Sequence, residues 1–392
     1  MSDSGKDIIQ TKNEKSGLVR SLEENLHLHK YSAEKVARFV LQYSEQNGTN
    51  ISKIGAKDFS RIYSFNNVVF KFSPDGQKSL AVKLFSGGEN SQSGFVAESL
   101  GKDFLQNSGI FGAESRILLP KNILESNADR LIATEFIDNL DQVYPLILED
   151  NKSKLLVDFL IRLNELKAIP TNLEQFANRS RYSKDSVYEI YQETVSRLEQ
   201  FKRWLDDDGK ITTKMWCTDN NIIPLFESRL NELLRFIDPI VLHKRTNITD
   251  LRFNWGDVSF PNMNFKLIDD KRILVPIDME YAGWDHFSGG ISSLLMHHSS
   301  EGLSDESKRL ILAEFVKNSR LSEQEKEELN ARLIATDLLF IARKLKPVTR
   351  PAHETKGLTF MRIPYESYTV AKIRMFLEPA LKRLMNNRID IK

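Results

Sequence analysis

The stretch of residues 254–285 constrains the fold of this 392-residue chain more than any other. Its apolar segment 273–277, with the sequence ILVPI, is typical of a buried strand. Residues 265–268 precede it, and the polar pair Asp269-Asp270 separates the two segments. Two strand-like segments joined by turn-forming residues predict a β-hairpin.

Three polar residues flank this predicted hairpin. Asp257 and Asn262 come before it, and Asp278 follows its second strand. Residues at the two ends of a hairpin can converge on one point. One carboxylate can then orient a hydroxyl group, while an amide and a second carboxylate hold Mg²⁺, as in a phosphoryl-transfer centre. For Asp257 and Asn262 alone, the alternative is a surface hairpin with acidic turn residues.

The pattern D-x4-N followed by I-D-x-E-Y-A-G-W resembles the catalytic core of the aminoglycoside phosphotransferase and choline kinase group, relatives of the protein kinases. The resemblance implies that Asp257 is the catalytic Asp and that Asn262 and Asp278 are metal ligands. Trp255 stands where that group usually has a histidine, two residues before the catalytic Asp. Because that histidine is mainly structural in the group, the difference removes no reacting group.

Further residues near the motif are assigned supporting roles. Glu280 could reach a second Mg²⁺, but we favour a structural role. Asp285 resembles a further acidic residue of the group, which braces the large lobe. The pair His297-His298 lacks partners at metal-ligand spacing, so we expect an ordinary helix end there.

The rest of the chain predicts an α+β, protein-kinase-like two-lobe fold. Strand patterns occur at 51–54, 61–65, 68–72, 80–85 and 131–137. Helical patterns occur at 32–43, 95–107, 155–166, 187–205, 224–237, 291–297, 304–316, 322–345 and 367–384, with a mostly polar interruption at 209–221. We therefore expect an N-terminal extension and helix (1–50), a small antiparallel-sheet N-lobe (51–137) and a mainly helical C-lobe (138–392).

A nucleotide site is predicted in the small lobe. The segment 81–84, AVKL, resembles the strand that presents the ATP-binding lysine, which here is Lys83. Glu98, in the predicted helix 95–107, could pair with it. An ammonium group held by a carboxylate can neutralise the α- and β-phosphates. A solvent-facing lysine is the alternative.

Two further segments could contact the nucleotide. Residues 55–60 lie between two predicted strands, where the resembling group covers the phosphates, so backbone amides or the Ser60 hydroxyl could bind phosphate. This segment has a single glycine, and an ordinary hairpin turn is the alternative. Residues 131–137 match the hinge between lobes, where backbone groups near Glu135 and Ile137 would bind adenine. An edge strand of the sheet is compatible with that role.

Composition narrows the classes of protein. The net charge of +1 gives no argument for nucleic-acid binding. The single cysteine, Cys217, excludes an internal disulfide framework and a Cys-rich zinc site. No apolar run has the length of a membrane span, and the first residues lack the apolar core of a signal peptide. We expect a cytoplasmic protein, and the sequence carries no signal for an oligomeric state.

The C-terminal region offers a clue to the acceptor. Residues 343–392 contain twelve Lys and Arg residues but four Asp and Glu residues. The basic and polar residues Arg350, His353, Lys356, Arg362 and Tyr365 suggest an acceptor that carries a carboxylate or phosphate. A solvated basic face is the alternative.

Together these features predict a Mg²⁺-dependent kinase that transfers the γ-phosphoryl group of ATP (or GTP) to a hydroxyl of a small acceptor. The sequence around Gly283-Trp284-Asp285 loosely resembles uncharacterised bacterial kinases of surface-saccharide biosynthesis, which favours a sugar-like acceptor. An aminoglycoside or choline-type acceptor is an alternative. So is a nucleotide-binding pseudokinase or scaffold, favoured by Trp255 and the glycine-poor loop. A protein-directed kinase is disfavoured because no Ala-Pro-Glu follows Asp278.

Overall fold

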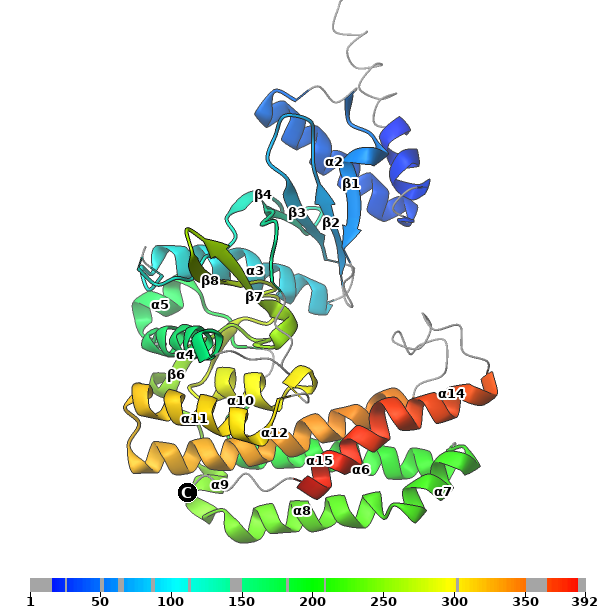
Figure 1. The fold of residues 1–392 in the computed structure, drawn as a ribbon, viewed down its shortest axis with the longest axis vertical. Coiled ribbons are helices and arrows are strands. Elements are labelled where there is room, and N and C mark those ends of the chain that lie inside the picture. Colours follow the sequence, from blue (N-terminus) through cyan, green and yellow to red (C-terminus); the bar gives the residue numbers. More distant parts are fainter. Residues whose placement is uncertain are drawn as a thin grey trace, which may run out of the picture. The chain divides into compact units, whose positions relative to one another are not determined.

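The computed structural model describes residues 16–386, except 25–26, 50–52, 63–66, 86–88, 112–113, 142–149, 181–182, 208, 301–302 and 350–364. The chain divides into two compact units (Figure 1). The N-terminal unit comprises Met1–Asp141 and Asn264–Ala282, and the C-terminal unit comprises Gln142–Met263 and Gly283–Lys392. The stretch 254–285, placed wholly in the C-lobe from the sequence, is thus shared between the two units.

An antiparallel sheet forms the centre of the N-terminal unit. Its strands are β1 (Phe59–Ile62), β2 (Val68–Phe72), β3 (Leu80–Leu84), β4 (Asn122–Ser126) and β5 (Leu131–Glu135). They lie in the order β1-β2-β3-β5-β4, and each neighbouring pair is antiparallel. The antiparallel sheet of the predicted small lobe is therefore confirmed.

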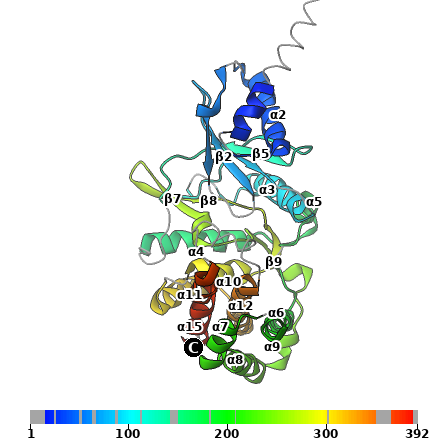
Figure 2. The same ribbon diagram turned by 90° about the vertical axis from the view of Figure 1, so that its right-hand side faces the viewer.

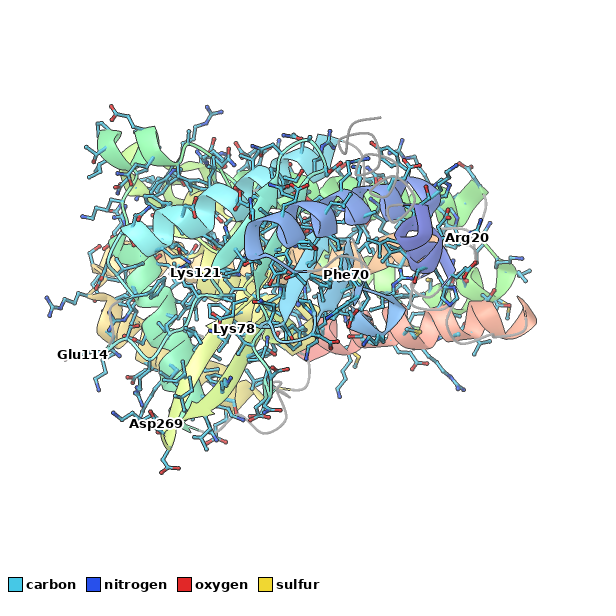
Figure 3. All side chains as sticks on the ribbon, turned by 90° about the horizontal axis from the view of Figure 1, so that it is seen from above. Arg20, Phe70, Lys78, Glu114, Lys121 and Asp269 are labelled. Atoms are coloured by element: carbon cyan, nitrogen blue, oxygen red, sulfur yellow. The ribbon has the colours of Figure 1, made fainter. Side chains whose placement is uncertain are left out.

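The two faces of this sheet are covered by different helices. Val82 and Leu84 of β3 share a buried cluster with α2 (Lys30–Asn47), and so does the fully buried Phe70, labelled in Figure 3. Because side chains alternate between faces along a strand, Lys83 points to the other side. There its cross-strand neighbour Ile132 packs with residues of α3 (Glu89–Asn107) and with Phe85. This alternation places Lys83 on the α3 face.

Parts of the predicted strand pattern are wrong. Residues 51–52 of the first predicted strand lie outside the described residues, and Lys53 and Ile54 are not in a strand. A 3-10 turn, η2 (Ala56–Asp58), follows instead, and Asp58 Oδ2 accepts the Gly55 N–H at 2.8 Å. This local side-chain bond favours a turn over a strand. The next predicted strand begins earlier, as β1, and β4 was not predicted.

The predicted hairpin is confirmed. Strands β7 (Met263–Ile268) and β8 (Lys271–Pro276) pair with each other. Asp269 and Asp270 have φ angles of 48° and 58°, and two positive φ angles are the signature of a type I′ turn. Figure 3 shows Asp269 at the tip of this hairpin. Asp278 and Glu280 follow β8 and belong to the same unit.

The C-terminal unit is mainly helical. It contains α4 (Asp150–Glu165), α5 (Pro170–Gln175), α6 (Val187–Asp207), α7 (Ile211–Asp219), α8 (Ile222–Phe236), α9 (Pro239–His243), α10 (Gly289–Met296), α11 (Asp305–Ser319), α12 (Glu323–Thr349), α14 (Tyr365–Lys372) and α15 (Glu378–Asn386). Helix α12 packs on both α6 and α15 (Figures 1 and 2). No helix within the described ranges is long and apolar enough to cross a membrane.

The mostly polar interruption expected at 209–221 contains a helix, α7. Its polar and small residues Thr213 and Cys217 are buried, whereas the apolar Ile211 and Met215 are exposed. Helices are recognised in a sequence by an apolar stripe that faces the core. Here the stripe is reversed, so the helix was missed.

A short two-stranded ladder carries the start of the functional stretch. Strand β6 (Leu251–Asn254) pairs antiparallel with β9 (Gly283–His286). The sequence did not predict either strand. Their pairing fixes Asn254 opposite Gly283 and anchors the loop that begins at Trp255.

Candidate active site

Lys83 lies at the centre of a cluster of carboxylates in the N-terminal unit. Its Nζ is 2.7 Å from Glu98 Oε2, 2.5 Å from Asp278 Oδ1 and 3.2 Å from Glu280 Oε2. These partners come from α3 and from the segment after β8. The pairing of Lys83 with Glu98 is thus present, and its role in nucleotide binding stays a prediction.

Electrostatics hold this cluster in its charged state. Burial alone would lower the pKa of Lys83, but the negative charges of Asp278, Glu98 and Glu280 raise it well above its usual value. Burial favours the neutral form of Glu98, yet Lys102 and Lys83 outweigh that effect and lower the pKa of Glu98 to about 2. Lys102 Nζ is 3.0 Å from Glu98 Oε1. Both ends of the Lys83–Glu98 pair therefore stay ionised near neutral pH.

Asp278 is the carboxylate of the cluster whose charged form is stabilised least. Burial raises its pKa, the nearby charges of Glu280 and Glu98 raise it further, and the attraction of Lys83 does not fully offset them. Among the described residues, the ion pairs of this cluster join three carboxylates to two ammonium groups, so negative charge is in excess there. Asp278 also has a φ of 65°, an uncommon backbone conformation of the kind that clusters at functional sites. An added cation would relieve this charge.

The residues present fit a magnesium ion that is shared with a nucleotide. Among the described residues, no group of three His, Cys, Asp and Glu side chains forms a metal site of its own. Mg²⁺ bound with a nucleotide commonly uses one or two carboxylates and takes its other ligands from phosphates and water. The excess negative charge around Asp278 suits that role.

Glu280 is a structural neighbour of Lys83. Its side chain is buried, and Asn67 donates a hydrogen bond to its Oε2. Burial would raise the pKa of Glu280, but Lys83, Tyr281 and Asn67 lower it overall. Helix α3 passes close to this side chain at Gly94, where an added Cβ would make an ordinary van der Waals contact of 3.4 Å with Glu280 Cβ.

Asp257 and Asn262 form a second group, in the C-terminal unit. Asn262 Nδ2 donates to the backbone oxygen of Asp257 at 3.1 Å and to its Oδ2 at 3.2 Å. Gly256, with a φ of 92°, supplies the backbone turn before Asp257 that a side-chain-bearing residue would rarely adopt. The two bonds use the amide nitrogen of Asn262, so its Oδ1, the atom able to ligate a metal, is not consumed by them.

A buried hydrogen-bond network braces this loop. Asn254 Nδ2 donates to Asp285 Oδ2 at 3.0 Å, and Asn254 Oδ1 accepts the Gly256 N–H at 3.1 Å. Burial raises the pKa of Asp285, although Arg332 and hydrogen bonds from His286 and Asn254 oppose that effect. Asn254 is a supporting residue that the sequence analysis missed.

Trp255 is a core residue. Its side chain is fully buried, and its ring meets that of Phe159 edge-on, with centroids 5.5 Å apart. Aromatic residues contribute large buried areas in this way. The position therefore supports the loop by packing.

His297 lies beside Asp257, which the sequence did not indicate. Its Nε2 is 4.0 Å from Asp257 Oδ1. The residue follows α10, where a helix-end pair was expected, and no local spacing relates it to Asp257. A contact between residues so far apart in the chain leaves no periodic signal.

The other predicted nucleotide-binding residues lie as follows. Ser60 is an exposed residue within β1, so the segment 55–60 leads into the first strand and does not connect two strands. The turn between β1 and β2 includes residues 63–66, which lie outside the described residues. Glu135 ends β5, and its N–H is already bonded to the Lys121 oxygen at 2.9 Å, so a contact to adenine would fall to its carbonyl. Ile137 follows β5.

The proposed acceptor residues are largely outside the described residues. Arg350, His353, Lys356 and Arg362 fall there, as does the side chain of Tyr365. Other basic residues of this region have structural partners. Lys372 Nζ donates to the Val348 oxygen at 3.0 Å, and Arg383 pairs with Asp337. These two are therefore not part of a solvated basic face.

No protein-family model and no curated protein sequence matches the chain. Solved structures do match over most of its length. The gentamicin complex of APH(2″)-IIa superposes with a TM-score of 0.51 at 15% identity, covering 88% of this chain and 97% of that one. Choline kinase LicA from Streptococcus pneumoniae gives a TM-score of 0.47 at 12% identity, covering 88% and 99%. The first of these likenesses shows the architecture: the chain has the kinase-like fold of an aminoglycoside phosphotransferase structure, as predicted.

Proposed function

We propose that the chain is a Mg²⁺-dependent phosphotransferase that moves the γ-phosphoryl group of ATP (or GTP) to a hydroxyl of a small acceptor. The observation that carries this proposal is the contact between Lys83 and Asp278, which are 195 positions apart in the sequence. With Glu98 on its other side, Lys83 has the surroundings expected of a phosphate-binding lysine. The fold shared with APH(2″)-IIa supports the same conclusion.

We assign binding of the nucleotide to the N-terminal unit. Lys83, oriented by Glu98, donates to the α- and β-phosphate oxygens. Asp278 would hold Mg²⁺, and the ion would supply positive charge against the charge that develops on the phosphates. Backbone groups at Glu135 and Ile137 are proposed to bind the adenine edge, and a Ser60 contact to phosphate is the weakest assignment because Ser60 lies within a strand.

The C-terminal unit is assigned the acceptor hydroxyl. Asp257 orients the hydroxyl and accepts its proton as the oxygen bonds to the γ-phosphorus. The bond from that phosphorus to the bridging oxygen breaks, and the nucleoside diphosphate leaves with the bonding electron pair. Asn262 holds Asp257 through its amide nitrogen and is assigned to Mg²⁺ through Oδ1.

The acceptor is proposed to be a sugar or a sugar-like metabolite, including one with an anionic group. The excess of basic residues in 343–392 supports the anionic group, and the loose resemblance at Gly283-Trp284-Asp285 supports the sugar. Segment 350–364 still offers Arg350, His353, Lys356 and Arg362 for recognition of a carboxylate or phosphate. Turnover of a neutral sugar is compared with turnover of its phosphorylated counterpart. Equal turnover of the two would indicate a sugar site that does not recognise the anionic group.

The proposal is tested by ADP release with Mg²⁺ across sugars, sugar phosphates, nucleosides, amino alcohols and aminoglycosides. Acceptor-dependent release that is lost in Asp278→Ala supports the assignment and names the acceptor class. Nucleotide binding without turnover on any acceptor contradicts it and favours a nucleotide-binding scaffold. Label from [γ-³²P]ATP that appears on protein instead of a small molecule favours a protein-directed kinase.

A further inference from the structure

We infer that His297 is a positioning residue for Asp257, holding one carboxylate oxygen while Asn262 holds the other. The inference rests on the proposed function, since it assumes that Asp257 orients the acceptor hydroxyl. Asn262 Nδ2 lies 3.2 Å from Oδ2, and His297 Nε2 lies 4.0 Å from Oδ1. Two groups on the two oxygens fix the rotation of a carboxylate better than one.

Hydrogen bonds on the other side of the ring fix which nitrogen carries the proton. His297 Nδ1 accepts the backbone N–H of Ser299 at 3.2 Å, and the Ser299 hydroxyl lies 2.8 Å from the same atom. An Nδ1 that accepts a backbone N–H carries no proton in the neutral ring. The proton is therefore on Nε2, the atom beside Asp257.

The ring is held in this orientation from several elements. Phe340 of α12 meets it edge-on, with centroids 5.6 Å apart. Ser299 Oγ also accepts the Phe260 N–H at 3.3 Å, which ties the segment carrying His297 to the loop carrying Asp257. Arg383 of α15 donates to the Met296 oxygen, one residue before His297. His297 is thus supported on both sides of its backbone and on its ring.

The contact is electrostatic at its present length. A distance of 4.0 Å exceeds that of a hydrogen bond, although contacts in a site without substrate commonly tighten when the reacting complex forms. Among the described residues, the charged groups near the ring include Asp257 from the loop after β6, Arg343 over the Phe340 ring, and Arg383, which donates to the Met296 oxygen and pairs with Asp337. Among these groups, Asp257 is the one that Nε2 of His297 faces.

The pairing is tested by NMR of the full chain labelled with ¹⁵N-histidine, in which His297→Gln identifies the His297 signal among the seven histidines. We expect the neutral ring to show the Nε2–H tautomer. We expect Asp257→Asn to shift the Nε2 signal of His297, because the carboxylate 4.0 Å from that nitrogen is removed. An Nδ1–H tautomer, or an Nε2 signal that is unchanged in Asp257→Asn, overturns the inference.

The role is tested by kinetics with the acceptor found in the panel. We expect His297→Ala to lower kcat by about 10- to 100-fold and to leave the nucleotide KM unchanged. The reason is that Asp257 would no longer be held in the orientation in which it accepts the proton of the acceptor hydroxyl. His297→Gln should restore most of kcat, because its amide can present an N–H to Asp257. His243→Ala, at an exposed histidine of the same unit, is the matched control.

Each remaining outcome is decisive. A wild-type kcat in His297→Ala overturns the positioning role. Equal losses in the Ala and Gln variants, together with an equally lowered Tm, also overturn it, because they indicate a merely structural residue. An absence of turnover in the wild-type chain overturns the proposed function instead, and NMR still decides whether His297 and Asp257 are paired.

Discussion

Asn254 donates a hydrogen bond to Asp285 at 3.0 Å across the β6–β9 ladder, although 31 positions separate the two residues in the chain. The same Asn254 side chain accepts the N–H of Gly256, the residue before Asp257. The ladder therefore fixes the loop of the proposed catalytic Asp through a single amide side chain. Because all three groups are buried, an unmade bond in this network costs free energy without compensation from water.

Gly289→Ala should break this network. A Cβ at Gly289 would collide with Asp285 Oδ2 and Asn254 Nδ2. We expect the free energy of unfolding to fall by about 1–3 kcal/mol, the cost of leaving buried polar groups unpaired. We also expect kcat to fall, because the loop before Asp257 loses its brace. Urea unfolding and steady-state kinetics measure the two effects.

Gly290→Ala is the matched control, because the added Cβ would lie 2.8 Å from the flexible end of the Leu160 side chain. We expect a smaller loss of stability, since Leu160 can move. If the two alanine variants unfold at the same urea concentration and keep the same kcat, the Asn254–Asp285 network does not support the loop.

Lys83→Met should reduce catalysis with the nucleotide. The change leaves Glu98, Asp278 and Glu280 without the ammonium group that all three contact. We expect kcat/KM for ATP to fall on the order of 100-fold, as for other lost charge-stabilising donors. Lys271→Met, at an exposed lysine of the same unit, should have no effect. An unchanged kcat/KM in a folded Lys83→Met protein rules out the phosphate-binding role.

Stability should fall as the pH drops through the range in which His286 titrates. Burial and the nearby charge of Arg332 together lower the pKa of His286 to about 4, despite the contact to Glu328. Unfolded His286 binds its proton more tightly, so unfolding takes up a proton between about pH 6.5 and pH 4. The contribution of His286 to the free energy of unfolding is therefore fully present above about pH 6.5. It is lost towards pH 4 and amounts to on the order of 3 kcal/mol.

Urea unfolding from pH 7 to pH 4 measures this effect, and His286→Gln is the comparison. The variant cannot titrate at this position, so its stability should depend less on pH than that of the wild type. Parallel curves for the two proteins would mean that His286 is already protonated in the folded state.

The sequence predicted elements whose signals are local. The hairpin turn at Asp269-Asp270 and the strand that carries Lys83 follow from neighbouring residues, and both are present in the structure. The β6–β9 ladder was missed because its two short strands lie far apart in the chain. Helix α7 was missed because its apolar residues Ile211 and Met215 face solvent.

The candidate site shows the same division. Asp257, Asn262 and Asp278 stand out because they flank a recognisable hairpin. Asn254 and His297 have no such signal in the sequence, because their roles depend on contacts to Asp285 and Asp257, which are distant in the chain. Ser60 was assigned to a loop because the segment before it was read as a strand, whereas the Asp58 side chain stabilises a turn there. Side-chain competition of this kind overrides β-propensity.

The central claim is that Asp257 acts in phosphoryl transfer and not in nucleotide binding. The most direct measurement compares the wild type with Asp257→Asn, using calorimetry for Mg²⁺–ATP binding and [γ-³²P]ATP for transfer to the acceptor. We predict that the variant binds the nucleotide with an affinity within about threefold of the wild type, since Asn keeps the shape of the side chain, but loses transfer by at least about 100-fold. Full transfer by Asp257→Asn would contradict the account.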